Sequence, residues 1–160
     1  MKRKPIAHIG FALYIVLLVW LVIFKLEPRF WALPQTGHSL NLIPFGASMM
    51  QNGGISLSEI VYNALFFLPL GMYLSFLNVT KKAGHGILIG LTVSIVFEAV
   101  QYAFKIGASD ITDVIMNTFG TAIGVFIGVK LRSKADTICF VLLIAEIILL
   151  LCYILLLAVQ

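Results

Sequence analysis

Two neighbouring apolar segments near the middle of this chain carry polar side chains that could do chemistry. Glu98 and Gln101 stand near the end of the first segment, and three more stand before or within the second: Asp110, Asp113 and Asn117. A carboxylate in the hydrocarbon core of a bilayer costs about 3 kcal/mol or more, so such a residue is by default a functional candidate. The pattern therefore marks residues 95–117 as the region that organises the chain.

These residue types permit two kinds of chemistry, and the sequence leaves both open. Glu98, Asp110 and Asp113 offer hard oxygen ligands, which suit Mg²⁺ or Ca²⁺, and a bound ion could then hold a phosphate group. Alternatively, a desolvated carboxyl group could act as a general acid or base, with Glu98 and Asp113 as the catalytic candidates. The sequence shows no Ser/His/Asp order, HExxH motif or phosphate-binding loop, so the metal hypothesis depends on residue type alone.

The composition is that of a membrane protein. The chain has 160 residues, of which 61% are hydrophobic and 11% charged, and its mean hydropathy is +1.05. Soluble domains average about 25% charged residues and about 45–50% apolar ones. The net charge of +4 does not point to nucleic acid here, because the basic residues are distributed as membrane topology requires.

Apolar runs predict one all-α membrane domain, covering residues 1–160, with five transmembrane helices in a helical bundle. The predicted spans are 6–24, 60–77, 87–104, 111–129 and 138–159. The fifth span is interrupted only by Glu146, which could pair with a neighbouring helix or stay protonated. Cys139 and Cys152 also lie in that run, about 20 Å apart along a helix, which is too far for a disulfide.

Basic residues indicate the orientation. With the N-terminus inside, the inner segments hold eight of the eleven Lys and Arg residues, and this bias places the N-terminus in the cytoplasm and the C-terminus outside. The inner set is Lys2, Arg3, Lys4, Lys81, Lys82, Lys130, Arg132 and Lys134, and the outer set is Lys25, Arg29 and Lys105.

The same alternation brings polar residues from separate segments to one depth. Glu98 lies about 9 Å before the outer end of its helix, and Gln101 lies about one turn nearer to that end. Asp113 and Asn117 fall in the first two turns of the next helix, while Asn63 lies one turn inside the outer start of the second span and Asn41 belongs to the outer loop. We therefore expect an outward-facing polar pocket within the outer third of the membrane.

Small residues predict which helices pack together. Gly120, Gly124 and Gly128 follow Asn117 on one helical face, and Gly86 and Gly90 repeat the spacing on the third span. Small residues at this interval allow helices to approach closely in lipid. We expect these glycine faces to pack the third span against the fourth.

Four motifs occur in order along the chain. They are Asn41-Leu-Ile-Pro-Phe45, Asn63-x-x-x-Phe67-x-Pro69-Leu-Gly71, Glu98-x-x-Gln101 and Asp110-x-x-Asp113-x-x-x-Asn117-x-x-Gly120. The set covers about residues 10–130 and resembles the VanZ-like family of bacterial membrane proteins. That family takes its name from low-level resistance to the glycopeptide antibiotic teicoplanin. The resemblance implies a role in the cell envelope, at the outer leaflet of the cell membrane.

Three functional hypotheses follow, and the first is favoured. The pocket would recognise a lipid headgroup or a lipid-linked cell-wall precursor and thereby alter glycopeptide susceptibility. The second hypothesis is a metal-dependent enzyme acting on a lipid-linked phosphate, and the third is a small transporter or accessory subunit. The expected ligand-binding residues are Asn41, Asn63, Glu98, Gln101, Asp110, Asp113 and Asn117.

Overall fold

The computed structural model describes residues 4–23, 39–45, 50–51, 54–55, 57–79, 82–106 and 108–159. The helices in this part of the chain are α1 (Lys4–Val22), α2 (Leu57–Phe76), α3 (Ala83–Phe104), α4 (Ile111–Lys130) and α5 (Ala135–Val159), and a 3₁₀ turn, η3 (Arg132–Lys134), precedes α5. All five helices are long and apolar enough to cross a membrane. Five helices of this kind were predicted and are confirmed, and the largest difference from the predicted bounds is that α3 begins at Ala83 rather than Ile87.

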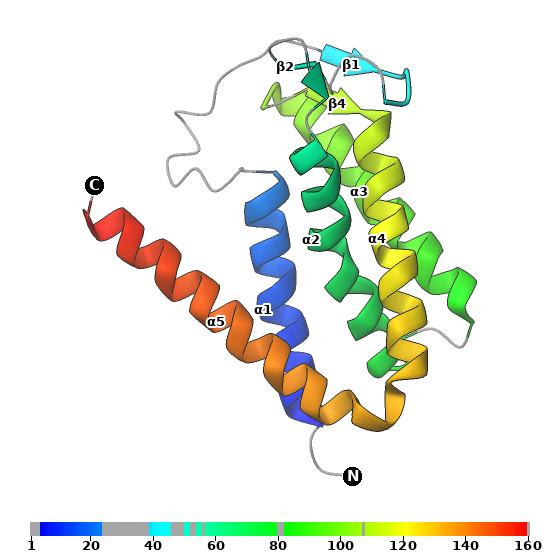
Figure 1. Ribbon diagram of the computed structural model, residues 1–160, viewed down its shortest axis with the longest axis vertical. Coiled ribbons are helices and arrows are strands. Elements are labelled where there is room, and N and C mark those ends of the chain that lie inside the picture. The colour runs from blue at the N-terminus through cyan, green and yellow to red at the C-terminus, as the bar shows by residue number, and fades with distance from the viewer. Residues whose placement is uncertain are drawn as a thin grey trace.

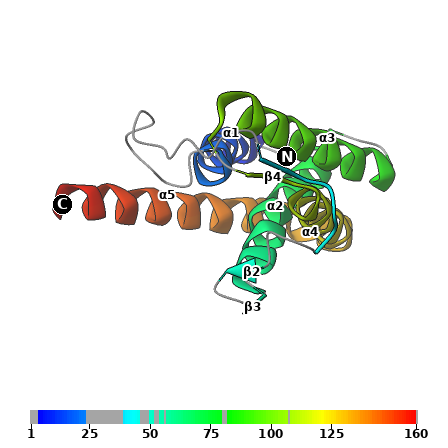
Figure 2. The same ribbon diagram turned by 90° about the horizontal axis from the view of Figure 1, so that it is seen from above.

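Helices α1 to α4 stand side by side, and α5 runs obliquely away from them toward the C-terminus (Figures 1 and 2). Successive helices alternate in direction, so α1 and α3 end where α2 and α4 begin. Short strands lie at that end of the bundle, which we call the strand end, and the N-terminus lies at the opposite end (Figure 1). The alternation brings together the residues that the sequence predicted to share one depth.

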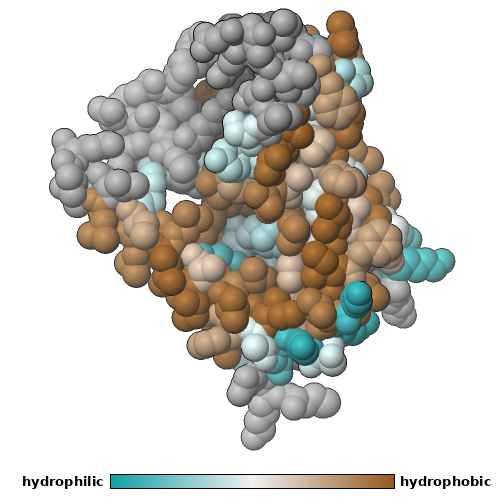
Figure 3. Space-filling view, viewed as in Figure 1, coloured by the Kyte–Doolittle hydropathy of each residue, from teal (hydrophilic) through white to brown (hydrophobic). Residues whose placement is uncertain are grey.

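Most of the side surface of the bundle is apolar. Brown side chains dominate the face shown in Figure 3, and teal ones gather at the lower end, near the turn between α4 and α5. Lys130, Arg132 and Lys134 are exposed at this turn, while large apolar side chains such as Phe126 and Leu155 are exposed along the helices. In water such a surface would drive aggregation, whereas in a bilayer it contacts acyl chains.

The glycine stripe of α4 packs against α2, and the expectation that it would face α3 was wrong. A Cβ atom added to Gly120 would overlap the carbonyl group of Ala64, and one added to Gly124 would overlap that of Leu68. Both helices begin at the strand end, so the four-residue spacing on α4 runs alongside the same spacing on α2. The third helix uses a different contact, in which Gly90 accommodates the side chain of Thr121.

Two short strand pairs cover the strand end. β1 (Ser39–Asn41) pairs in parallel with β4 (Ala108–Asp110), and β2 (Met50–Gln51) pairs antiparallel with β3 (Gly54–Ile55). The all-α prediction did not include these strands. The exposed side chains of Leu42, Ile43 and Phe45 place residues 42–45 on the surface of the strand end.

α5 is the least buried of the five helices: 6% of the residues in its apolar span are buried, against 44% in that of α4. It packs mainly on α1, and Glu146 is buried within it. The Tyr73 hydroxyl on α2 donates a 2.9 Å hydrogen bond to Glu146 Oε1, so the acid pairs with a neighbouring helix, one of the two outcomes that the sequence left open. Cys139 and Cys152 are both free, as their spacing predicted.

Candidate functional site

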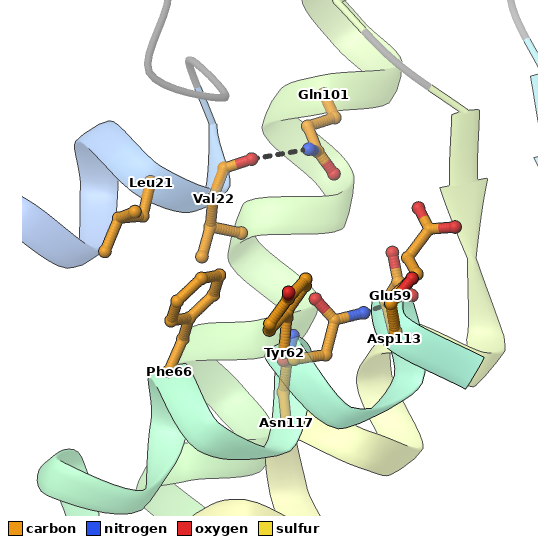
Figure 4. A pocket seen from close by; sticks show the side chains of 10 residues that line it. Leu21, Val22, Glu59, Tyr62, Phe66, Gln101, Asp113 and Asn117 are labelled. Carbon is orange, nitrogen blue, oxygen red and sulfur yellow. Dashed lines mark hydrogen bonds between the residues drawn. The ribbon is translucent and has the colours of Figure 1, made fainter. Parts of the chain in front are cut away.

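A polar cavity of about 300 Å³ opens at the strand end, where four helices meet. The end of α1 and of α3, and the beginning of α2 and of α4, each contribute side chains (Figure 4). The lining residues are Leu21, Val22, Ser58, Glu59, Tyr62, Asn63, Phe66, Gln101, Asp113 and Asn117. In Figure 4, Leu21 and Val22 lie on one side of the pocket, and Glu59 and Asp113 lie on the other.

Hydrogen bonds between helices fix the polar side chains of the pocket. Asn63 Nδ2 on α2 donates to Asp113 Oδ1 on α4 over 2.5 Å. Gln101 Nε2 on α3 donates to the carbonyl oxygen of Val22 at the end of α1, at 3.0 Å. These two bonds tie α2 to α4 and α3 to α1, so the pocket is held by all four helices.

A third bond, deeper in the bundle, orients Asn117. Its Nδ2 donates to Ser94 Oγ on α3 at 2.9 Å, and both residues are buried. The Thr121 hydroxyl, one turn further along α4, donates to the carbonyl oxygen of Asn117 at 3.0 Å. Asn117 is thus positioned from both its side chain and its backbone.

Two buried amide oxygens in the pocket have no hydrogen-bond partner among the described residues, namely Gln101 Oε1 and Asn117 Oδ1. The Gln101 side chain is 4% exposed and that of Asn117 is 1% exposed. The orientation of the Gln101 amide is set by its partner, because the Val22 carbonyl can only accept a hydrogen bond. The Ser94 hydroxyl can donate or accept, so it leaves the orientation of the Asn117 amide open. A buried acceptor that stays unpaired is destabilising, and both oxygens are closed off from the cavity by the atoms around them.

The charge of the pocket is negative in the part of the chain that the structure describes. Glu59 and Asp113 line it, and the described lining residues include no Lys or Arg. Tyr62 and Phe66 stand one turn apart on α2, with ring centroids 6.0 Å apart and planes 16° apart. The pocket therefore combines carboxylates, amide oxygens and aromatic rings.

A second polar cluster lies beside the pocket and connects it to the strands. Asp110 caps α4, since its Oδ1 accepts from the Thr112 amide at 2.7 Å, and its Oδ2 accepts from Asn41 Nδ2 at 2.9 Å. Its own backbone amide donates to Glu98 Oε2 at 2.9 Å. The Phe45 amide donates to Thr112 Oγ1 at 3.0 Å. We call Asn41, Glu98, Asp110 and Thr112 the clasp, because they join the loop before α2 to the junction of α3 and α4.

The structure divides the predicted ligand-binding residues between these two clusters. Asn63, Gln101, Asp113 and Asn117 line the pocket. The other three belong to the clasp: Asn41, Glu98 and Asp110. Glu98 is buried, with its carboxylate directed at the amide before α4.

Sequence reasoning missed several lining residues. Glu59 stands four residues before Asn63 and therefore shares its helical face, a signal that was available in the sequence. Tyr62 and Phe66 flank the same stripe. Leu21 and Val22 gave no signal, because apolar residues at the end of an apolar helix are indistinguishable from lipid-facing ones.

The described residues contain no group of three or more His, Cys, Asp and Glu side chains that could hold a metal ion. Asp113 lines the pocket, while Glu98 and Asp110 meet in the clasp through a backbone amide. The proposed Mg²⁺ or Ca²⁺ site of Glu98, Asp110 and Asp113 therefore gains no support from this geometry.

Comparison with known proteins gives matches over the same part of the chain. A family model described as VanZ/LLP1 matches residues 11–132. Protein VanZ of Enterococcus faecium is 39% identical over 129 residues, which are 78% of this chain and 72% of that protein. No solved structure matches the chain. The matched region runs from α1 to the end of α4 and contains the pocket and the clasp.

Proposed function

This chain belongs to the VanZ/LLP1 family, and we propose that its strand-end pocket faces the outside of the cell membrane and recognises a polar headgroup there. The headgroup belongs to a membrane lipid or to a lipid-linked cell-wall precursor. Binding of this headgroup by the chain alters the susceptibility of the cell to glycopeptide antibiotics such as teicoplanin. The chain is thus a binding protein of the bacterial cell envelope.

One observation carries this proposal: polar side chains from separate helices line one cavity, and they include Gln101 and Asn117, each with a buried amide oxygen that has no partner in the described structure. A folded protein rarely keeps such acceptors unpaired unless a ligand or water meets them. Hydrogen bonds between helices hold the neighbouring polar groups in place. A cavity prepared in this way is suited to binding, because little ordering remains to be done when the ligand arrives.

The orientation follows from the basic residues. Lys82, Lys130, Arg132 and Lys134 lie at the end opposite the strands, and Lys105 lies at the strand end. Cytoplasmic segments of membrane proteins carry an excess of Lys and Arg. This distribution supports a strand end, with the pocket, that faces outward.

The two alternatives gain less support from the described residues. A phosphate substrate would enter a pocket lined by two carboxylates and by no described Lys or Arg, which is unfavourable unless a cation accompanies it. A transporter needs access from both sides, whereas the polar lining residues all lie at one end of the bundle.

The test is glycopeptide susceptibility in cells that express the chain. We expect the Asp113→Asn variant to lack the effect that the wild-type protein has on susceptibility. The substitution removes charge from the pocket, while the new amide oxygen can still accept the hydrogen bond from Asn63. Glu98→Gln should do the same by weakening the clasp that sets the end of α3 beside α4. Minimum inhibitory concentrations of teicoplanin measure the effect at equal amounts of membrane-inserted protein.

The matched control is Asp136→Asn, which neutralises an exposed acid in the first turn of α5, at the other end of the bundle. It should behave as wild type. If Asp113→Asn changed teicoplanin susceptibility as much as the wild-type chain does, the proposed role of the pocket would be contradicted.

A further inference from the structure

We propose that an apolar groove between α1 and α5 binds one acyl chain of a membrane lipid, the lipid whose headgroup reaches the strand-end pocket. The groove has a volume of about 300 Å³. This inference rests on the proposed function only for the headgroup end of the ligand. Three features of the molecule lead to it: a hydrogen bond that fixes α5, the narrow shape of the groove, and its continuity with the pocket.

The first feature is a hydrogen bond from α2 that holds α5 in place. The Tyr73 hydroxyl donates to Glu146 Oε1 at 2.9 Å, and both side chains are buried. Gly10 on α1 makes room for this bond, because a Cβ atom there would lie 2.6 Å from the Tyr73 hydroxyl oxygen and 3.6 Å from Leu143 Cβ on α5. The other carboxyl oxygen of Glu146 has no partner among the described residues. The acid therefore depends on Tyr73 for its hydrogen bond.

The groove continues from this contact along the same helical faces. Leu150 and Tyr153 line it and follow Glu146 by four and seven residues, so they share its face of α5. On α1, Leu17 lines the groove and follows Gly10 by seven residues. Toward the C-terminus α5 runs obliquely away from the bundle (Figure 1). The bond between Tyr73 and Glu146 therefore fixes the position of α5 from which one wall of the groove extends.

The second feature is the narrow shape of the groove, which favours a lipid chain over a helix of a second copy. Trp20 on α1 and Tyr153 on α5 both line it, and their rings meet edge to face with centroids 6.4 Å apart. An α-helix with its side chains is about 10–12 Å across, so it would not fit between these rings. A hydrocarbon chain is thinner and flexible. It can enter from the bilayer, because the lining residues Val16 and Ile154 are 63% and 50% exposed.

The third feature is continuity with the strand-end pocket. Leu21 lines both the groove and the pocket. Both sites lie toward the strand end, because residues 16–22 form the last turns of α1. A lipid with its headgroup at the pocket would place an acyl chain along the groove. Such a lipid should exchange more slowly than lipid on the rest of the surface, because two linked contacts must be lost together.

The experiment uses Trp20 as a fluorescent reporter in the groove. The chain has two Trp residues, and Trp31→Phe leaves Trp20 as the single one. The purified full-length variant in detergent micelles is titrated with phosphatidylglycerol and, separately, with phosphatidylethanolamine, each carrying brominated acyl chains. Bromine quenches tryptophan fluorescence on contact. We expect saturable quenching of Trp20 by at least one of these lipids, and its reversal by the same lipid without bromine.

A second reporter measures contact with lipid in general. Phe119 is 55% exposed on α4, so a chain with Phe119→Trp, Trp20→Phe and Trp31→Phe carries its one tryptophan on the exposed surface of the bundle. Its quenching should rise in proportion to the brominated lipid without saturating. Titration curves of the same shape for this reporter and for Trp20 would overturn the proposal, because they would show a general lipid surface only.

Variants connect the quenching to the groove and to the bond that fixes α5. Val16→Phe fills the groove and should abolish saturable quenching of Trp20, while Val96→Phe, the same change at an exposed position of α3, should leave it unchanged. Tyr73→Phe and Glu146→Leu should also abolish it. Glu146→Gln can still accept from Tyr73 and should keep it. Melting temperatures identify the folded variants, and saturable quenching at the wild-type level in folded Glu146→Leu would overturn the role of the bond.

Native mass spectrometry separates a lipid from a second copy in the groove. A phospholipid that stays on the monomer, and is lost with Val16→Phe, supports the proposal. A dimer that Val16→Phe dissociates would overturn it and assign the groove to a second copy. Quenching of Trp20 that never saturates would also overturn it, and would leave the headgroup proposal for the pocket in place. The proposed function falls separately, if Asp113→Asn has the wild-type effect on glycopeptide susceptibility.

Discussion

Asp110 joins three segments through three hydrogen bonds, and this explains the polar residues that lie outside the pocket. Its carboxylate accepts from Thr112 in α4 and from Asn41 in β1, while its amide donates to Glu98 in α3. Because each partner is itself in a different element, the single residue sets where α4 begins relative to the end of α3. Glu98 is accordingly held by a backbone amide, a stabilising arrangement for a buried carboxylate.

We expect Asp110→Ala to lower the melting temperature of the purified protein more than Asp110→Ser does. Alanine removes the helix cap, worth about 0.5–2 kcal/mol, and also removes the shorter of the two hydrogen bonds that Asn41 Nδ2 donates, the other being to the Ile43 carbonyl oxygen. Serine can still cap α4 but is too short to accept from Asn41. Asn41→Ala should lower the melting temperature at least as much as Asp110→Ser, since it loses the link to Asp110 and also the hydrogen bond in which the Ile43 amide donates to Asn41 Oδ1. An unchanged melting temperature for Asp110→Ala would show that the clasp does not support the fold.

At the scale of elements, the contact between α2 and α4 is the closest in the bundle. Gly71 lies against the backbone of Val125 and Gly124, and Gly124 lies against that of Leu68. The Ser75 hydroxyl donates to the carbonyl oxygens of Gly71 and Val125, at 3.0 and 3.2 Å. In lipid, close packing and such bonds replace the hydrophobic effect as the source of helix association.

Gly124→Ala should destabilise this contact by about 1–3 kcal/mol, the usual cost of forcing an extra methyl group into a packed interface. The added Cβ would overlap the Leu68 carbonyl, which is backbone and cannot move aside alone. Gly84→Ala is the matched control, because nothing lies within 4 Å of a Cβ added there. Denaturation in detergent compares the two. Equal stability of Gly124→Ala and Gly84→Ala would contradict the described contact.

The sequence predicted the spans and the common depth of the polar residues, but it did not identify the neighbours of each helix. A stripe such as Gly120, Gly124 and Gly128 shows that a helix has a close partner, and α2 and α3 each offer a glycine for it, Gly71 and Gly90. The choice of α2 depends on three-dimensional packing. The pairing of β1 with β4 is equally non-local, since it joins Asn41 to Asp110 by backbone register.

The candidate site was predictable in its location and only partly in its membership. Hydropathy and alternation placed Asn63, Gln101, Asp113 and Asn117 together, and these four line the pocket. Glu98 was expected in the same place because it is the most costly residue in its span. It lies in the clasp instead, since burial of a carboxylate shows that a partner exists without telling whether that partner is a ligand or the backbone.

At the scale of the whole molecule, the two ends of the bundle differ in kind. The strand end carries the pocket, the clasp and the exposed apolar side chains of Leu42, Ile43 and Phe45. The opposite end carries exposed Lys and Arg residues. The exposed side chains of Leu42, Ile43 and Phe45 suit the interface between lipid headgroups and acyl chains, where they would keep the pocket at the depth of the headgroups. All of these assignments require the strand end to face away from the cytoplasm.

This orientation can be tested with single cysteines in a background of Cys139→Ala and Cys152→Ala. We expect Lys105→Cys, at the exposed end of α3, to react with a membrane-impermeant maleimide in intact cells. Lys134→Cys, in the exposed turn before α5, should react only after the membrane is permeabilised. Both positions are lysines in water-exposed turns, so accessibility to the reagent is the main difference between them. The reverse labelling pattern would place the pocket on the cytoplasmic side, where it could not act on a glycopeptide target outside the cell.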